Sequence, residues 1–186
     1  MMTRPWVAIQ RNPRSGSGRR RRELVDLCRT LRCHDITPRL FARREELDER
    51  VREMTSRKHL VAVVAAGGDG TVVDVVNRHP DVPLAVLPMG TENLLARFLR
   101  LPGSGRELGE LIAAGCTRKL DVGRANGQLF TLVASAGFDA FVAHELDRNR
   151  SGHITHFAYV QPIWTALRTY RYPRLRVFVD DQPDPI

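Results

Sequence analysis

One short stretch of the chain holds residues whose types and spacing suit it to binding a phosphate. Positions 67–71 have the sequence Gly-Gly-Asp-Gly-Thr. The apolar run at 60–66 is typical of a strand buried on both faces, and residues 71–77 favour a helix. A strand, a glycine turn and a helix N-terminus together present backbone N–H groups to an anion, so the stretch predicts a phosphate-binding loop.

Asp69 is the one side chain of this turn that can do chemistry. A carboxylate beside phosphates is repelled unless a cation or a proton lies between them, so Asp69 predicts a Mg²⁺ ligand or a hydrogen bond to a hydroxyl. The alternative is a purely structural turn in which Asp69 caps the helix. Three glycines around one acid favour the phosphate, and these glycines permit backbone angles closed to other residues.

A second loop of small, turn-forming residues spans positions 11–18. It follows an apolar strand predicted at 6–10 and precedes a helix predicted at 19–32, so it can approach phosphates or a ribose in the same way. Arg11 and Arg14 can add positive charge to that contact.

A third loop, Pro-Met-Gly-Thr-Glu-Asn at 88–93, follows a buried strand predicted at 84–87. Thr91 lies where a hydroxyl can either cap the next helix or bind a nucleotide, and Asn93 can orient either arrangement. For Thr91 taken alone, helix capping is the favoured interpretation.

The elements around these loops predict the fold. Strands and helices alternate along residues 1–117, which is typical of an α/β lobe with a parallel sheet and helices on both faces. Ligands bind beyond the carboxyl ends of the strands in such sheets, so we expect the three loops to converge there. We therefore expect a nucleotide-binding lobe at 1–117 and the start of a β-rich second lobe at 118–186.

The pattern of residues 118–186 differs from that of the first lobe. Asn126-Gly127, between two extended segments, predicts a hairpin. Helices are predicted at 140–148 and 157–170, and alternating side chains predict a strand at 175–180. Because that last strand has no return strand, we expect the second lobe to be incomplete.

Composition limits the class of protein. The 186 residues are 42% hydrophobic and 27% charged, as is typical of soluble globular proteins, and no apolar run is long enough to span a bilayer. The N-terminus lacks the pattern of a signal peptide, so we expect a cytoplasmic protein. The three cysteines lack metal-ligand spacing and are expected to be reduced thiols.

The net charge of +8 is concentrated at the N-terminus. Residues 1–44 contain twelve arginines and three acidic residues, whereas the remainder contains 17 basic and 18 acidic residues. Such a charge can attract nucleic acid, an anionic membrane surface or a nucleotide. For the run Arg19–Arg22 alone, a solvated helix face is the favoured interpretation. No recognition motif or aromatic stacking platform supports a nucleic-acid partner.

Three motifs resemble those of the diacylglycerol kinase catalytic-domain family, which includes bacterial lipid kinases and sphingosine and ceramide kinases. The block at 67–77 is similar to the family's Gly-Gly-Asp-Gly-Thr-x-x-Glu-Val-x-Asn block, and residues 12–18 are similar to its N-terminal Asn-Pro-x-Ser-Gly-x-Gly loop. Residues 88–97 are similar to its Pro-x-Gly-Thr-x-Asn-Asp-x-Ala-Arg segment. Two later segments, 120–124 and 136–139, are similar to those that open the family's second lobe.

The resemblance implies an ATP-dependent kinase that transfers a phosphoryl group to a lipid hydroxyl, with diacylglycerol or a sphingoid-type lipid as acceptor. It implies ATP and Mg²⁺ as cofactors, Asp69 as the metal ligand, and a lipid at a membrane surface as the partner, with peripheral membrane contact. The implied nucleotide-binding residues are Asn12, Ser15, Gly16, Gly67, Gly68, Asp69, Gly70, Thr71, Gly90, Thr91 and Asn93.

The chain departs from the family at two of these motifs. Asp74 replaces the usual Glu, and Leu94 replaces the usual Asp after Asn93. In the family, the carboxylate that takes the hydroxyl proton lies in a part of the second lobe beyond where this chain ends, so the resemblance implies that no catalytic base lies within these 186 residues. The alternatives are an NAD kinase-like phosphotransferase, which shares Gly-Gly-Asp-Gly, and a non-catalytic nucleotide-binding module. The particular lipid and the oligomeric state stay open.

Overall fold

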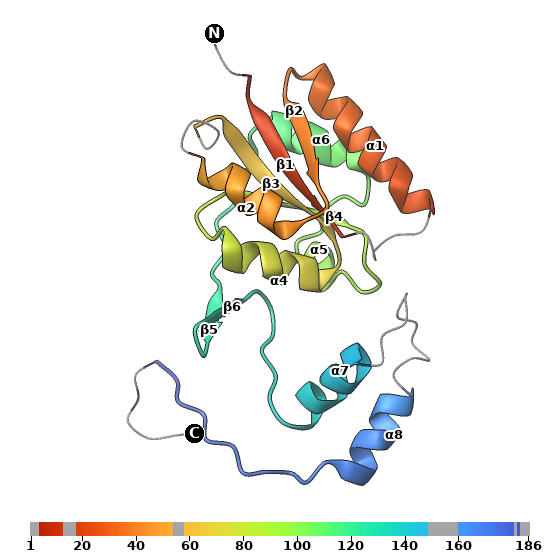
Figure 1. Ribbon diagram of the computed structural model, residues 1–186, viewed down its shortest axis with the longest axis vertical. Coiled ribbons are helices and arrows are strands. Elements are labelled where there is room, and N and C mark those ends of the chain that lie inside the picture. Colours follow the sequence, from red (N-terminus) through yellow and green to blue (C-terminus); the bar gives the residue numbers. More distant parts are fainter. Residues whose placement is uncertain (1–3, 13–17, 54–57, 149–159, 181, 183–186) are drawn as a thin grey trace. The chain divides into compact units, whose positions relative to one another are not determined.

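A computed structural model describes residues 4–12, 18–53, 58–148, 160–180 and 182 (Figure 1). The chain divides into two compact units, Met1–Leu132 and Val133–Ile186. The boundary expected after residue 117 stays a prediction.

A four-stranded parallel sheet forms the centre of the first unit, with the strand order β2-β1-β3-β4. Its strands are β1 (Trp6–Arg11), β2 (Thr37–Phe41), β3 (Leu60–Gly67) and β4 (Leu84–Pro88). The central strands β1 and β3 are buried along most of their length, which is why their sequences are continuous apolar runs rather than alternating patterns.

Helices cover both faces of this sheet (Figure 1). One face packs against α1 (Gly18–Cys33) and α6 (Gly105–Ala113). The other face packs against α2 (Arg44–Arg52), α4 (Asp69–Arg78) and α5 (Leu94–Phe98). Successive side chains of β1 and β3 enter the two cores in turn, as the geometry of a strand requires. The predicted α/β class is confirmed.

The direction of the chain across the sheet reverses between β1 and β3. From β1 the chain crosses through α1 to β2 at one edge, and from β3 it crosses through α4 to β4 at the other edge. Right-handed crossovers that run in opposite directions place their helices on opposite faces, as found for α1 and α4. In open α/β sheets, ligands bind outside the carboxyl ends of the strands at such a reversal.

A short antiparallel hairpin lies near the end of the first unit. Its strands are β5 (Gly123–Ala125) and β6 (Gln128–Phe130), joined by Asn126 and Gly127. Both turn residues have positive φ, 49° and 82°, as a type I′ turn requires. The predicted hairpin is confirmed.

The second unit contains the described helices α7 (Phe138–Arg148) and α8 (Val160–Thr169). Residues 157–159 of the helix predicted at 157–170 lie outside the described residues. The strand predicted at 175–180 is wrong, because the segment has no strand structure and no described segment pairs with it. Alternating side chains give a segment one apolar face, but a strand forms only where a neighbouring strand accepts and donates its backbone hydrogen bonds.

Candidate nucleotide-binding site

The loops that follow β1, β3 and β4 meet at the carboxyl edge of the sheet. The backbone N–H of Asn12 donates to the carbonyl of Ala66 at 3.2 Å, and the N–H of Met89 donates to the carbonyl of Gly67 at 2.8 Å. The side-chain amide of Asn12 also donates to the Thr71 hydroxyl at 3.4 Å. The predicted convergence of the three loops is confirmed, whereas their binding of a nucleotide stays a prediction.

Gly68 and Gly90 bring the second and third loops into backbone contact. A Cβ built on Gly90 would lie 2.4 Å from the Cα of Gly68, and a Cβ on Gly67 would lie 2.2 Å from the Thr71 hydroxyl oxygen. The unusual backbone angles that glycine permits are not adopted here, since Gly67, Gly68 and Gly70 have no positive φ. Glycine is needed at both positions for close approach, since a side chain at 90 would hold the two loops apart and one at 67 would overlap the Thr71 side chain.

Asp69 lies in the first turn of α4, and its carboxylate is bound across the site. Oδ1 accepts a hydrogen bond from the backbone N–H of Leu95, in the first turn of α5, at 3.2 Å. The acid thereby satisfies one of the N–H groups left free at a helix start. The capping alternative therefore applies to α5, whereas the N-cap of α4 is Gly68. A carboxylate has several acceptor positions, so this bond leaves capacity for a cation.

Asn93 shapes the third loop. It adopts the left-handed conformation, with φ 50° and ψ 51°, which asparagine tolerates better than most residues. Its Oδ1 accepts from the N–H of Gly90 at 2.8 Å, and its Nδ2 donates to the carbonyl of Gly90 at 2.8 Å. The residue at the N-cap position of α5 is Asn93. The helix cap predicted at Thr91 is therefore wrong. Thr91 is exposed in the same loop.

Arg20 is a residue of this region that the sequence interpretation missed. Its guanidinium donates to the carbonyls of Met89 and Gly90, which fastens the third loop to α1. Hydrogen bonds from a charged donor are stronger than neutral ones. Arg21 and Arg22 are exposed, whereas Arg20 is partly buried, so a solvated helix face describes Arg21 and Arg22 but not Arg20. Nothing in the sequence of this run shows that Arg20 turns inward while Arg21 and Arg22 do not.

Of the remaining predicted residues, the structure describes Gly70. It is exposed, and a Cβ built there would meet no heavy atom within 4 Å. Ser15 and Gly16, which the resemblance implies, lie outside the described residues, as does Arg14. Across the residues that the structure describes, no group of three or more histidine, cysteine, aspartate or glutamate side chains could hold a metal ion.

A partly buried ionic network supports the C-terminal end of α4. Arg78 donates to the carboxylates of Asp48 and Asp74, and to the side-chain oxygen of Gln10 at 3.2 Å. The Nε2 of His79 lies 2.8 Å from the same Asp48 oxygen. Burial lowers the pKa of His79 below its usual value, and the nearby Asp48 carboxylate partly opposes that shift. Asp74, which stands where the family usually has Glu, therefore takes part in this network by accepting a hydrogen bond from Arg78.

Comparison with known proteins places this fold in the class of α/β kinase lobes. The structure is similar to a diacylglycerol kinase of Bacillus anthracis str. Sterne, with a TM-score of 0.54 and 28% identity over 70% of this chain and 46% of that chain. Residues 7–125 match the diacylglycerol kinase catalytic domain. The chain belongs to the diacylglycerol kinase catalytic-domain family, which confirms the resemblance.

Two relatives come from staphylococci. A diacylglycerol kinase of Staphylococcus haemolyticus (strain JCSC1435) is 30% identical over 96% of this chain and 56% of its own length. A diacylglycerol kinase of Staphylococcus aureus (strain bovine RF122 / ET3-1) is 31% identical over 80% of this chain and 49% of its own length. The chain thus spans about half the length of the relatives that it matches.

Proposed function

We propose that this chain is the nucleotide-binding part of an ATP-dependent lipid kinase. The observation that carries the proposal is the meeting of the loops after β1, β3 and β4 at one sheet edge, in a member of the diacylglycerol kinase catalytic-domain family. The names of the relatives support a lipid alcohol such as diacylglycerol as the acceptor.

The ATP phosphates are proposed to lie against the loop 67–71. The first turn of α4 offers backbone N–H groups at the positive end of a ten-residue helix. Gly70 faces open space, so a phosphate can approach the backbone there without meeting a side chain. The third loop and Asn12 are proposed to line the same nucleotide site, together with Ser15 and Gly16.

Asp69 is proposed to hold the Mg²⁺ that accompanies ATP. Its carboxylate is fixed by the Leu95 N–H, which leaves acceptor positions for a hard cation that prefers oxygen ligands. When bound, Mg²⁺ neutralises the charge that develops on the phosphates during transfer. The protein's part is to hold this carboxylate at the loop while Asn93 and Arg20 keep the third loop in place.

The base that accepts the hydroxyl proton is proposed to lie outside these residues. The relatives extend well beyond the length that this chain matches. A carboxylate from that further part is the group that we expect to act as base. Without it, we expect the chain to bind nucleotide and to transfer phosphate slowly or not at all.

The test is incubation with radiolabelled ATP, Mg²⁺ and vesicles that contain diacylglycerol or sphingosine. Calorimetric titration of the chain with a non-hydrolysable ATP analogue is expected to show binding, and the chain joined to the second lobe of a relative is expected to label the lipid. Failure of that extended protein to label any lipid would sink the proposal. Formation of NADP from NAD would favour the NAD kinase-like alternative. Nucleotide binding by the extended protein without transfer to any acceptor would favour a non-catalytic module.

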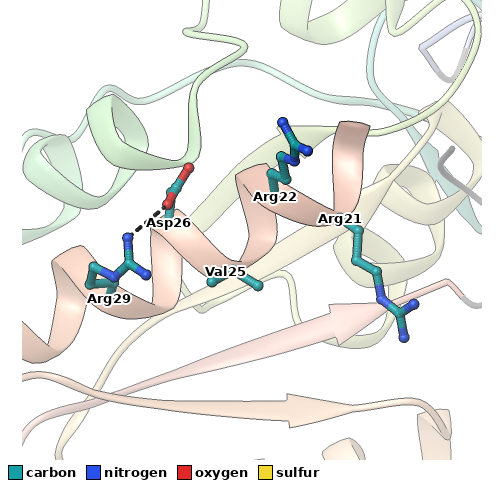
Figure 2. A pocket seen from close by; sticks show the side chains of 5 residues that line it. All are labelled: Arg21, Arg22, Val25, Asp26 and Arg29. Carbon is teal, nitrogen blue, oxygen red and sulfur yellow. Dashed lines mark hydrogen bonds and ion pairs between the residues drawn. The ribbon is translucent and has the colours of Figure 1, made fainter. Parts of the chain in front are cut away.

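The exposed side of α1 is proposed as a peripheral membrane contact. Arg21, Arg22 and Arg29 spread around the exposed Val25, and Asp26 pairs with Arg29 at 3.4 Å (Figure 2). We call these three arginines the arginine face. An anionic lipid surface attracts each such charge by about 1 kcal/mol. Among the described residues, no helix has the length and apolar character to cross a membrane.

A further inference from the structure

We propose that Asn77 is a positioning residue whose side-chain amide holds the β5–β6 hairpin against α4 as a neighbouring strand would. Its Oδ1 accepts from the backbone N–H of Leu129 at 2.8 Å. Its Nδ2 donates to the carbonyl of the same residue at 2.9 Å. One side-chain amide thus makes both of the bonds that a strand offers to a residue beside it. This role of Asn77 does not depend on which nucleotide or which lipid the protein binds.

The register of the hairpin explains why Leu129 is available for these bonds. Ala125 faces Gln128 beside the two-residue turn, and Arg124 faces Leu129. In such a hairpin the pair that flanks the turn exchanges backbone hydrogen bonds, so the next pair does not. The N–H and C=O of Leu129 therefore point to the free edge of β6, where Asn77 meets them.

A third bond fixes the orientation of the amide. The Nδ2 of Asn77 also donates to the carbonyl of Val73, one turn earlier in α4, at 2.9 Å. A flipped amide would place its oxygen against the carbonyl oxygens of Val73 and Leu129, so only the observed orientation satisfies all of these groups. Both amide protons and the oxygen are used, and one of the three bonds anchors the side chain to α4 itself.

These bonds join a very short element to α4. Strand β6 has three residues, and an isolated two-stranded hairpin is marginally stable in water. The first unit ends two residues after β6, at Leu132. Asn77 therefore fixes the segment from which the chain leaves the first unit. Helix α4 contributes to the candidate site with its first turn and holds the hairpin with its last.

Amide hydrogen exchange at Leu129 tests the proposal. Asn77→Leu keeps the size of the side chain and removes all of its hydrogen bonds, so the protection factor of Leu129 is expected to fall at least about tenfold while the β3 amides keep theirs. The matched control is Gln128→Leu, which removes an exposed amide from the same strand and is expected to change Leu129 protection by less than about twofold. Unchanged protection in Asn77→Leu, or an equal loss across β3, would overturn the proposal.

Asn77→Asp adds a pH-dependent readout that a purely space-filling role would not show. The ionised carboxylate can accept from the Leu129 N–H but repels the Leu129 carbonyl, whereas the protonated carboxyl regains a donor. Protection of Leu129, corrected for the intrinsic exchange rate, is expected to rise as the pH falls through about 4, and not in Asn77→Leu. If this rise is missing, the strand-like role is excluded, even where Asn77→Leu fails to fold.

Discussion

The carboxylate of Asp69 accepts a hydrogen bond from the backbone N–H of Leu95 at 3.2 Å, so one acid links the loop after β3 to the helix after β4. This contact gives Asp69 a structural role beside its proposed role as a magnesium ligand. The two roles differ in what they require. A helix cap needs an acceptor oxygen, whereas a hard cation favours a charged carboxylate.

Asp69→Asn is therefore expected to keep the fold and weaken magnesium-dependent ATP binding at least about tenfold, because the amide retains an acceptor but loses the charge. Asp69→Ala removes both and is expected to lower the free energy of unfolding by about 1 kcal/mol as well. Urea unfolding and ATP titrations with and without Mg²⁺ measure the two effects. Full magnesium-dependent affinity in Asp69→Asn would contradict the metal role.

Gly90→Ala is expected to push the second and third loops apart. Its Cβ would lie 2.4 Å from the Cα of Gly68, and the backbones of both residues are held by other hydrogen bonds. Overpacking of this kind lowers the free energy of unfolding by about 1–3 kcal/mol. The control is Gly103→Ala, where a Cβ meets no heavy atom within 4 Å. Equal stability of the two variants would show that the close approach is dispensable.

Stability is expected to decline in acid because of His79. Burial lowers the pKa of His79 in the folded protein, so the unfolded chain, whose histidine has a pKa of about 6.5, takes up the proton first. The free energy of unfolding is therefore highest above about pH 7, falls as the pH drops through 6.5, and levels off below the folded pKa.

His79→Gln keeps a hydrogen-bond donor toward Asp48 and cannot titrate, so its stability is expected to change less over this range. Urea unfolding of both proteins at about pH 7.5 and pH 5.5 makes the comparison. Parallel pH profiles for the two proteins would assign the decline to other groups.

Replacement of the arginine face by glutamine is expected to weaken binding to anionic vesicles by roughly a hundredfold, from about 1 kcal/mol for each arginine. Co-sedimentation with phosphatidylglycerol vesicles at low and high salt measures this, since salt screens exposed charges. The control removes three other exposed positive charges, those of Arg171, Arg174 and Arg176. If both triple variants lose affinity equally, net charge and not this face draws the protein to lipid.

Hydrophobic patterning was sufficient to predict most of the first unit. A strand in the middle of a parallel sheet is buried on both faces, so the apolar run at 60–66 already indicates where β3 lies. The loops that must meet could be predicted as well, because parallel strands end at one edge. The strand wrongly predicted at 175–180 shows the limit of this reasoning, since a pattern within one segment contains no information about a partner.

The detailed contacts of the site were beyond prediction for a related reason. Arg20 binds the Gly90 carbonyl across 70 positions of sequence, and Asp69 binds Leu95 across 26. Which arginine of a run turns inward, and which helix start an acid reaches, depends on how the helices pack against the sheet. Residue type and local spacing do not contain that information.

The same separations bear on how the protein folds. The bonds of Asn12 to Thr71 and of Arg20 to Gly90 span 59 and 70 positions, so they can form only after the intervening chain has been brought together, at a large loss of chain entropy. A peptide of residues 60–78 would contain the whole glycine loop and neither Asn12 nor Arg20. We therefore expect such a peptide to lack the shaped loop, which would form only late in the folding of the first unit.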